Sequence, residues 1–196
     1  MALSKIQAES INLADTFAFT GTVSGTDGGF AYLAEQDASS TTQVDFTIPS
    51  GAKQIVFTAE EFNTTATGSP VLLIQLGDSG GVENSGYFVS EAYTANLQPS
   101  AGNHIFGDNN TSDNAWNLGQ WSGHVSDGRR FYASGQIVQT RNSNTWMCNT
   151  QVLYGPSAQF WIHLGGRKTL SAELTTVRFS SFGTFSTGHF RLAYHL

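Results

Sequence analysis

The stretch that decides the fold covers residues 131–154 and reads FYASGQIVQTRNSNTWMCNTQVLY. Over 131–139, small or apolar residues alternate with more polar ones, and a period of two is typical of a β-strand with one buried face. Residues 141–144 supply turn-forming side chains, and 145–154 then returns with the composition of a second strand. The stretch therefore predicts an antiparallel β-hairpin.

The same pattern of short apolar runs, broken by Gly, Asn, Ser and Asp, continues in both directions along the chain. Residues 71–76, VLLIQL, are nearly all apolar, which predicts a central strand buried on both faces. Residues 44–48 and 54–57 are expected to pair as a hairpin around a turn at 49–51. The remaining expected elements are strands at 16–23, 159–164, 172–179 and 190–196, and a turn at Gly165-Gly166-Arg167.

These strands predict an all-β fold class, namely an antiparallel β-sandwich of jelly-roll type in which two sheets pack face to face. The chain has 196 residues, a length that one sandwich domain can cover. Only 12% of the residues are charged, so an amphipathic helix would have few side chains for its solvent-facing side. We therefore expect one domain without long helices.

Residues 1–14 contain neither Gly nor Pro, unlike the rest of the chain. We expect them to form an N-terminal arm, either a short helix or an extended segment docked on a neighbour, ahead of a sandwich domain at 15–196. The apolar residues of the arm are candidates for anchoring or for contact with another subunit: Leu3, Ile6, Ile11 and Leu13.

The charge distribution bears on the partners. A net charge of −6 argues against nucleic acid, because phosphate binding needs clustered Lys and Arg. Residues 1–128 hold two Lys against fourteen acids, a net charge of 2 − 14 = −12, whereas 129–196 hold seven Lys or Arg against one Glu, 7 − 1 = +6. The two parts could attract each other, either within one sandwich or between neighbouring subunits. The alternative is that the imbalance is loose surface charge.

Cys148 is the one cysteine of the sequence, so no intrachain disulfide can form. Residues 1–8 lack the charged start and apolar run of a secretory signal. No apolar stretch approaches the roughly 20 residues that span a bilayer. We expect a soluble protein that is made in the cytoplasm and does not insert into a membrane.

The motif Gly77-Asp78-Ser79-Gly80-Gly81 matches the loop that carries the nucleophile of trypsin-like serine proteases. In those enzymes the His base and the Asp precede the Ser, whereas every His of this chain follows Ser79. The alternative is a glycine-rich turn in which Asp78 or Ser79 bonds nearby backbone amides. We favour the turn.

No residue pattern indicates a metal or an active site. The histidines lack metal-ligand spacing, and Asp108, Asp113 and Asp127 lack the regular spacing of a calcium loop. Glycoside hydrolysis needs two carboxylates that face each other across a cleft. Nothing singles out one of the conceivable pairs, which are Glu60 with Glu61, Asp78 with Glu83, and Asp108 with Asp113. We therefore expect no enzyme activity, no metal site and no cofactor.

Two segments have the composition of loops: 60–70, which is polar, and 92–128, which is long and combines polar residues with aromatic ones. Aromatic and amide side chains together suit sugars, and binding residues often lie on loops. The candidates for binding a glycan or another receptor are Tyr93, Asn109, Asn110, Trp116, Asn117 and Trp121. The alternative is that both tryptophans cap the core or a subunit interface.

Three passages carry a resemblance. They are SKI at 4–6 with SINLADTFAFTGTV at 10–23, IQLGDSGGVENSGY at 74–87, and SNTW at 143–146 with KTLSAELTTVRF at 168–179. They are similar to parts of a domain found near the ends of many bacteriophage tail-fibre and related virion proteins, especially in marine phages. In order, they resemble the lead-in segment of that domain, its strand with a glycine turn, and its "Asn-Thr-Trp" strand with the hairpin that follows.

The resemblance implies a β-sandwich virion structural protein, a homotrimer whose partners are other tail or capsid proteins. The first hypothesis is a tail-fibre or tail-tip adhesion module whose segment 92–128 contacts a host cell-surface glycan. The second is a capsid decoration or tail accessory protein that has no ligand and is held by its arm. A depolymerase is disfavoured because no carboxylate pair stands out. Either hypothesis puts the protein on the virion surface, at the tail or the capsid.

Overall fold

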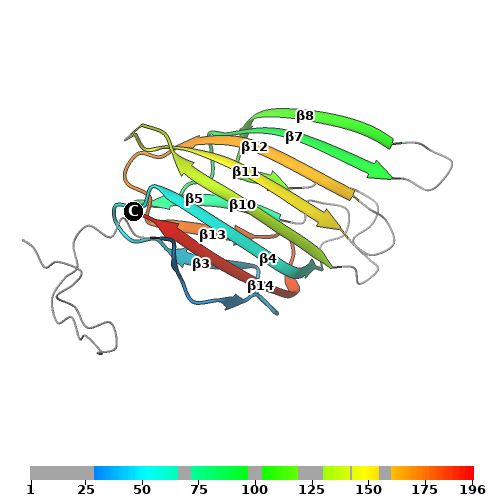
Figure 1. Cartoon of the computed structure of the whole chain (residues 1–196), viewed down its shortest axis with the longest axis horizontal. Coiled ribbons are helices and arrows are strands. Elements are labelled where there is room, and N and C mark those ends of the chain that lie inside the picture. The colour runs from blue at the N-terminus through cyan, green and yellow to red at the C-terminus, as the bar shows by residue number, and fades with distance from the viewer. Residues whose placement is uncertain (1–28, 66–71, 97–102, 119–129, 142, 155–159) are drawn as a thin grey trace, which may run out of the picture.

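The computed structural model describes residues 29–65, 72–96, 103–118, 130–141, 143–154 and 160–196. These residues form β-strands and no helix, and the strands make two antiparallel sheets that pack against each other (Figure 1). The predicted all-β, antiparallel β-sandwich is confirmed. In this part of the chain there is no helix with the length and apolar character needed to cross a membrane.

Sheet A has nine strands in the order β1-β14-β4-β10-β11-β12-β7-β8, and β2 also pairs with β14. Its strands are β1 Ala31–Tyr32, β2 Gln36–Asp37, β4 Gln54–Thr64, β7 Tyr87–Asn96, β8 Asn103–Asp113, β10 Phe131–Gln139, β11 Thr145–Tyr154, β12 Phe160–Thr169 and β14 Phe185–His195. Sheet B has five strands in the order β3-β13-β5-β6, and β9 also pairs with β5. Its strands are β3 Gln43–Thr47, β5 Leu72–Asp78, β6 Gly81–Val82, β9 Trp116–Leu118 and β13 Thr176–Ser180.

The chain passes repeatedly from one sheet to the other. Strand β3 pairs with β13 in sheet B, whereas β4 pairs with β14 and β10 in sheet A. The predicted hairpin between 44–48 and 54–57 is therefore wrong. The connection carries buried Ile48 and Ala52, which hold it against the core as it crosses between the sheets. The jelly-roll subtype stays a prediction.

The hairpin at 131–154 is confirmed. Strands β10 and β11 pair without interruption from Phe131 opposite Tyr154 to Gln139 opposite Trp146. Its inward positions are buried, among them Ala133, Ile137 and Cys148. The strand predicted at 71–76 is also confirmed, since all residues of β5 except half-buried Gln75 are buried.

Aromatic rings fill the space between the sheets. Phe57 of sheet A packs on Phe179 of sheet B with ring centres 5.0 Å apart, and Phe179 also contacts Phe190 at 5.3 Å. Full burial of such a side chain stabilises a fold by roughly 2 kcal/mol. This packing joins the two layers.

Glycine makes room for two of the buried rings. A Cβ added at Gly135 would lie 2.7 Å from Cζ of Phe57, and one added at Gly166 would overlap the indole of Trp116. The predicted turn at Gly165-Gly166-Arg167 is wrong, because β12 runs straight through it. Gly166 is required there for packing rather than for turning.

Two segments predicted as loops contain strands. Strand β4 continues to Thr64 because Phe62 is fully buried, so the polar loop at 60–70 is wrong up to residue 65. The segment 92–128 contains the end of β7, all of β8 and all of β9, because polar residues are tolerated along a strand at the edge of a sheet. The arm at 1–14, with Leu3, Ile6, Ile11 and Leu13, and the strand at 16–23 lie outside the described residues.

Ion pairs join the acidic and basic parts of the chain within the sandwich. Each pair described below unites a basic residue after position 129 with an acidic residue before position 128. They are Arg130–Glu61, Lys168–Glu83, Arg178–Asp45 at 2.7 Å, and Arg191 with Glu35 at 2.6 Å and with Glu60 at 3.0 Å. Attraction within one sandwich, one of the predicted alternatives, is therefore present.

Candidate functional site

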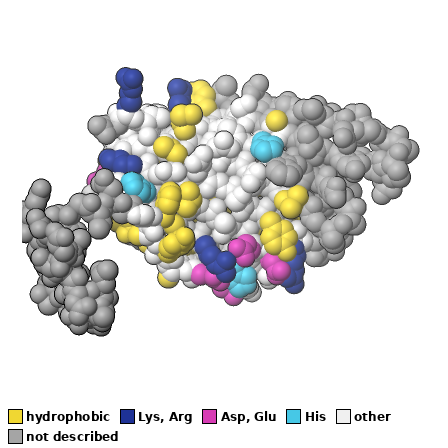
Figure 2. Space-filling model, viewed as in Figure 1, with side chains coloured by type: hydrophobic (Ala, Val, Ile, Leu, Met, Phe, Trp, Pro, Cys, Tyr) yellow, Lys and Arg dark blue, Asp and Glu magenta, His cyan; other side chains and the backbone are white. Residues whose placement is uncertain are grey.

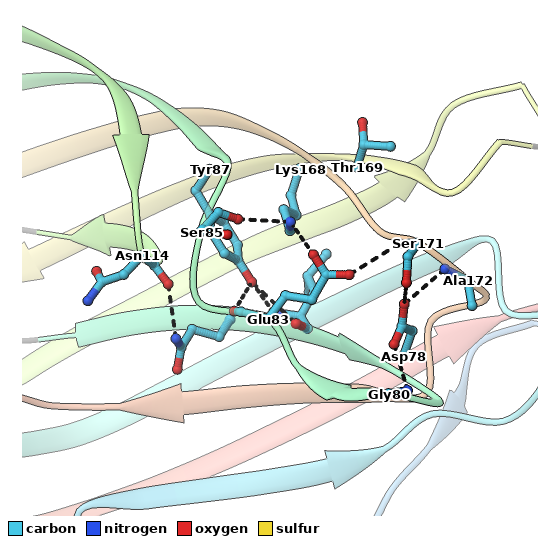
Figure 3. Close-up of polar contacts among 12 residues, drawn as sticks. Asp78, Gly80, Glu83, Ser85, Tyr87, Asn114, Lys168, Thr169, Ser171 and Ala172 are labelled. Carbon is cyan, nitrogen blue, oxygen red and sulfur yellow. Dashed lines mark hydrogen bonds and ion pairs between the residues drawn. The ribbon is translucent and has the colours of Figure 1, made fainter.

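Polar side chains gather in two places. The first, which we call the clasp, lies where β5 turns into β6, and its members are Asp78, Glu83, Lys168, Ser171 and Ala172 (Figure 3). The second, which we call the groove, is an open depression of about 580 Å³ on the outer face of sheet A. It is lined by Val56, Phe57, Thr58, Ser134, Gly135, Gln136, Asn149, Gln151 and His163.

Asp78 is the centre of the clasp. It is 5% exposed, and its Oδ1 accepts a hydrogen bond from the Gly80 amide at 2.8 Å. Its Oδ2 accepts from the Ser171 hydroxyl at 2.6 Å and from the Ala172 amide at 2.9 Å. The Ser171 hydroxyl, followed by the backbone amides, holds the pKa of Asp78 below its ordinary value of 3.8. The glycine-rich turn predicted at 77–81 is thus confirmed, with Asp78 bonding a turn amide.

Lys168 is buried beside Glu83, with a side chain 5% exposed. Its ammonium group pairs with Glu83 and donates a hydrogen bond to the Ser85 carbonyl at 2.9 Å. It also lies 5.2 Å from the centre of the Tyr87 ring, a cation–π contact. A buried cation is tolerated only when it is paired in this way.

Tyr87 connects the clasp to the core. Its hydroxyl accepts a hydrogen bond from the Leu76 amide at 2.7 Å and lies 3.1 Å from the Glu83 carbonyl, to which it can donate. Burial raises the pKa of Tyr87 above its ordinary value of 10.0. The ring packs edge-to-face on Trp116, with centres 5.5 Å apart.

The polar atoms of the clasp form hydrogen bonds and an ion pair with other groups of the protein. They tie the β5–β6 hairpin to the segment between β12 and β13, as the dashed contacts in Figure 3 show. The structure thus brings together Asp78 and Glu83, one of the carboxylate pairs considered above, but their oxygens are occupied by Ser171, Lys168 and backbone amides. This geometry gives the pair a structural role.

The groove follows from the alternation of four neighbouring strands. Side chains alternate along a strand, so the neighbours of each inward-facing residue project outward. On β4, β10, β11 and β12, the register aligns these outward residues in two rows across the sheet. The first row is Val56, Gln136, Asn149 and Gly165. The second row is Thr58, Ser134, Gln151 and His163.

Four polar side chains of the groove are exposed: Gln136, Asn149, Gln151 and His163. Gln136 Oε1 accepts a hydrogen bond from Gln54 Nε2 at 3.3 Å. Gln151 Nε2 donates to Ser134 Oγ at 3.1 Å, which leaves its second N–H and its carbonyl oxygen available. Within the described residues, the Asn149 side chain makes no hydrogen bond. Donors and acceptors held on rigid strands are what a binding surface for a hydroxyl-rich molecule needs.

The groove has an apolar side. Tyr132, 40% exposed, and Leu153, 47% exposed, are register partners on β10 and β11 next to the second row. The Tyr132 hydroxyl lies 3.4 Å from Glu61 Oε1, to which it donates. The polar rows and this pair together make an amphipathic surface.

Acidic and basic side chains gather together on one side of the groove. In Figure 2 the middle of the outer face of sheet A is mainly neither hydrophobic nor charged, Lys or Arg side chains lie at the upper left, and acidic and basic side chains gather along the lower edge. We call this the charged edge, and its ion-paired members are Glu35, Glu60, Glu61, Arg130 and Arg191. No Asp, Glu, Lys or Arg lines the groove where the structure describes it.

A reactive cysteine and a metal centre are two further kinds of site that a protein can carry. Cys148 is buried, and desolvation raises the pKa of its thiol to about 12, so it is not an activated nucleophile. The described part of the chain contains no cluster of three or more His, Cys, Asp or Glu residues able to hold a metal ion. Of the three aspartates considered for calcium, Asp108 and Asp113 lie on β8, and Asp127 falls outside the described residues.

The described members of the glycan-binding set predicted at 92–128 are divided between the two sheets. Trp116 is 0% exposed, so the prediction that it stacks on a ligand is wrong and the alternative of a core tryptophan is right. Asn117 is half-buried and pairs with Leu73 in sheet B. The other three placed residues, Tyr93, Asn109 and Asn110, lie on β7 and β8 of sheet A, and Trp121 lies outside the described residues.

Sequence reasoning missed the groove although its residues lie in the stretch that decides the fold. Ser134, Gln136, Asn149 and Gln151 are the outward positions of the 131–154 hairpin. A usable signal was present: these positions hold uncharged polar residues, where Lys and Glu usually cover an exposed sheet face.

Neither the family models nor the curated proteins contain a match to this chain.

Proposed function

We propose that this chain is a non-enzymatic adhesion module of a bacteriophage virion, in a tail fibre or at the tail tip, and that it binds a host cell-surface glycan through the groove. The observation that carries the binding role is the set of exposed amide and hydroxyl side chains in the two rows on the outer face of sheet A, with no Asp, Glu, Lys or Arg in the lining of the groove. The virion setting comes from the sequence resemblance, which also suggests a homotrimer attached to other virion proteins.

The chemistry of the groove supports a sugar ligand. Amide side chains such as Gln136 and Asn149 can donate to one hydroxyl and accept from another. Tyr132 and Leu153 offer an exposed apolar surface on which the C–H face of a sugar ring can lie. Because paired strands carry these side chains, little backbone entropy is lost on binding, which favours a specific ligand over a loosely held one.

A capsid decoration or tail accessory protein without a ligand is the second candidate. It is favoured by exposed apolar side chains around the C-terminus: Phe30 at 38%, Tyr32 at 81% and Leu196 at 65%. Such residues suit attachment to a neighbouring protein. In that case the groove would be a solvated sheet face.

Binding of the purified protein to a panel of immobilised oligosaccharides and to host cells tests the proposal. Asn149→Ala and Gln151→Ala each remove side-chain hydrogen-bonding groups, and each is expected to weaken binding about fivefold, the equivalent of one net hydrogen bond. Gln43→Ala is the matched control, because Gln43 is an exposed strand glutamine on sheet B. Equal binding by all variants would overturn the assignment of the site.

Cryo-electron microscopy of intact phage particles tests the location. The adhesion proposal predicts density at the tail periphery with the outer face of sheet A directed away from the particle. Density on the capsid shell with that face covered would favour the decoration protein instead.

A further inference from the structure

We infer that the groove selects an uncharged, extended oligosaccharide that lies across the strands, an inference that rests on the proposed glycan binding. The observations behind it are the absence of charge in the lining, the pairing of the nearby cations, and the direction of the two polar rows.

The lining offers no Arg or Lys to pair with an acidic sugar. Carboxylate and sulfate groups are bound most strongly by Arg and Lys through charge-assisted hydrogen bonds. The nine lining residues include neither. Uncharged amides and hydroxyls instead match the hydroxyl groups of a neutral sugar.

The arginines of the charged edge are already engaged. Arg191 donates from Nε to Glu35 at 2.6 Å and from Nη1 to Glu60 at 3.0 Å. Arg130 pairs with Glu61. Three carboxylates face the two guanidinium groups and His189, whose Nδ1 lies 3.1 Å from Glu35 Oε1, so this edge has no excess of positive charge. Since charges act over about 8 Å at physiological salt, the edge does not draw anions into the groove.

Arg167 is the basic residue that follows the polar rows on β12. It follows Gly165 by two positions on β12, and its guanidinium carbon lies 4.6 Å from the centre of the Phe88 ring. Stacking on Phe88 holds its charge over β7 rather than over the polar rows. An acidic glycan, if one were preferred, would have to recruit this side chain or Arg191, the register partner of Thr58 on β14.

The rows set the direction and length of the ligand. They cross four adjacent strands, β4, β10, β11 and β12, and three spacings of about 4.8 Å give a span of about 14 Å. Polar side chains recur along this whole span, from Thr58 to His163. A single sugar ring would leave part of the second row unused, so affinity should rise with the length of the oligosaccharide.

The experiment titrates the full-length protein with neutral oligosaccharides of increasing length and with uronic-acid and sulfated oligosaccharides of the same lengths, at low and at high salt. Neutral ligands are expected to bind about tenfold or more tightly than acidic ones. Their affinity should grow with length, change little with salt, and be unaffected by Arg167→Gln.

A blocking variant ties the binding to the groove. Ser134→Tyr places a large ring among the two rows, on a strand that accommodates aromatic residues, and should abolish binding of the neutral ligand. Thr47→Tyr is the matched control, because Thr47 is exposed on β3 of sheet B. Thermal unfolding of both variants verifies that they are folded.

Two results would overturn the inference, and they differ in what they leave standing. Tighter binding of acidic oligosaccharides, lost in Arg167→Gln or at high salt, would refute the choice of a neutral ligand and leave glycan binding intact. Absence of binding by oligosaccharides of either class would refute glycan binding itself.

Discussion

The clasp and the groove are both built from polar side chains on strands, but they use them in opposite ways. In the clasp, the carboxylate of Asp78 receives three hydrogen bonds from the protein, and Lys168 is buried against Glu83. In the groove, Asn149 and Gln151 are exposed and keep hydrogen-bonding capacity for another molecule. Internal pairing marks a region that holds the fold, and unused capacity on a rigid face marks a region that can bind.

The most conspicuous sequence motif and the groove lie in different parts of the molecule. The most conspicuous motif, Gly77-Asp78-Ser79-Gly80-Gly81, belongs to the clasp. The residues with binding capacity belong to an ordinary alternating hairpin. Substitutions in the clasp region should therefore change stability, and substitutions in the groove should change affinity.

Trp116→Ala should give the largest effect. Its indole is fully buried, packs on Tyr87 and fills the space above Gly166, so its removal is expected to lower the free energy of unfolding by about 4 kcal/mol. Chemical denaturation measures the loss. The folded fraction of this variant should retain its glycan affinity. A variant that stays folded but fails to bind would show that Trp116 takes part in binding.

Lys168→Met should give the next largest effect. The substitution removes the charged hydrogen bonds to Glu83 and Ser85 while keeping most of the side-chain volume, and should cost about 2 kcal/mol. Lys53→Met, at an exposed position, should change the unfolding free energy by less than about 0.5 kcal/mol. Equal stability of the two variants would show that the clasp does not hold the fold.

The clasp should also make stability depend on pH. Because the Ser171 hydroxyl and two backbone amides lower the pKa of Asp78 in the folded state, its contribution is complete above the ordinary value of 3.8 and is lost as the pH falls through the lowered folded value. Melting temperatures measured downward from neutral pH should fall in this acidic range. Asp78→Asn should flatten the fall, and an unchanged acid profile would contradict the assignment.

Glu173, which lies outside the clasp, also contributes to the loss of stability at acidic pH. Its carboxylate accepts hydrogen bonds from the Gly51 amide at 2.7 Å and from Ser50 at 3.0 Å, and these lower its pKa from 4.5. Glu173→Gln therefore serves as the comparison variant: it should remove a separate part of the acid dependence and leave the part due to Asp78.

Gln151→Ala should have the smallest effect on stability and a measurable one on binding. The side chain is exposed and makes one hydrogen bond to Ser134, so the unfolding free energy should change by less than about 0.5 kcal/mol. The affinity for a glycan should fall about fivefold. A loss of stability as large as that of Lys168→Met would erase the distinction between the two regions.

Local patterns in the sequence predicted the parts of the fold that depend on neighbouring residues. The hairpin at 131–154 and the buried strand at 71–76 follow from periodicity alone. The pairing of β3 with β13 and of β4 with β14 depends on residues more than 100 positions apart, so periodicity placed 44–48 and 54–57 in one hairpin by mistake.

None of the residues that the sequence singled out for glycan binding lines the groove. The segment 92–128 attracted that prediction because its Asn and Trp residues stand out. The groove depends on the register of four strands, which brings Thr58 and His163 into one row. Residues so far apart in sequence meet only through that register.

The most direct test of the account is an NMR titration of the isotope-labelled protein with a neutral oligosaccharide. The account predicts that the amide signals of β10, β11 and β12 around Ser134, Asn149 and His163 shift, while those of the clasp around Asp78 and Ser171 do not. Shifts confined to the clasp, or to β8 at the edge of sheet A, would contradict the assignment of the groove as the binding site.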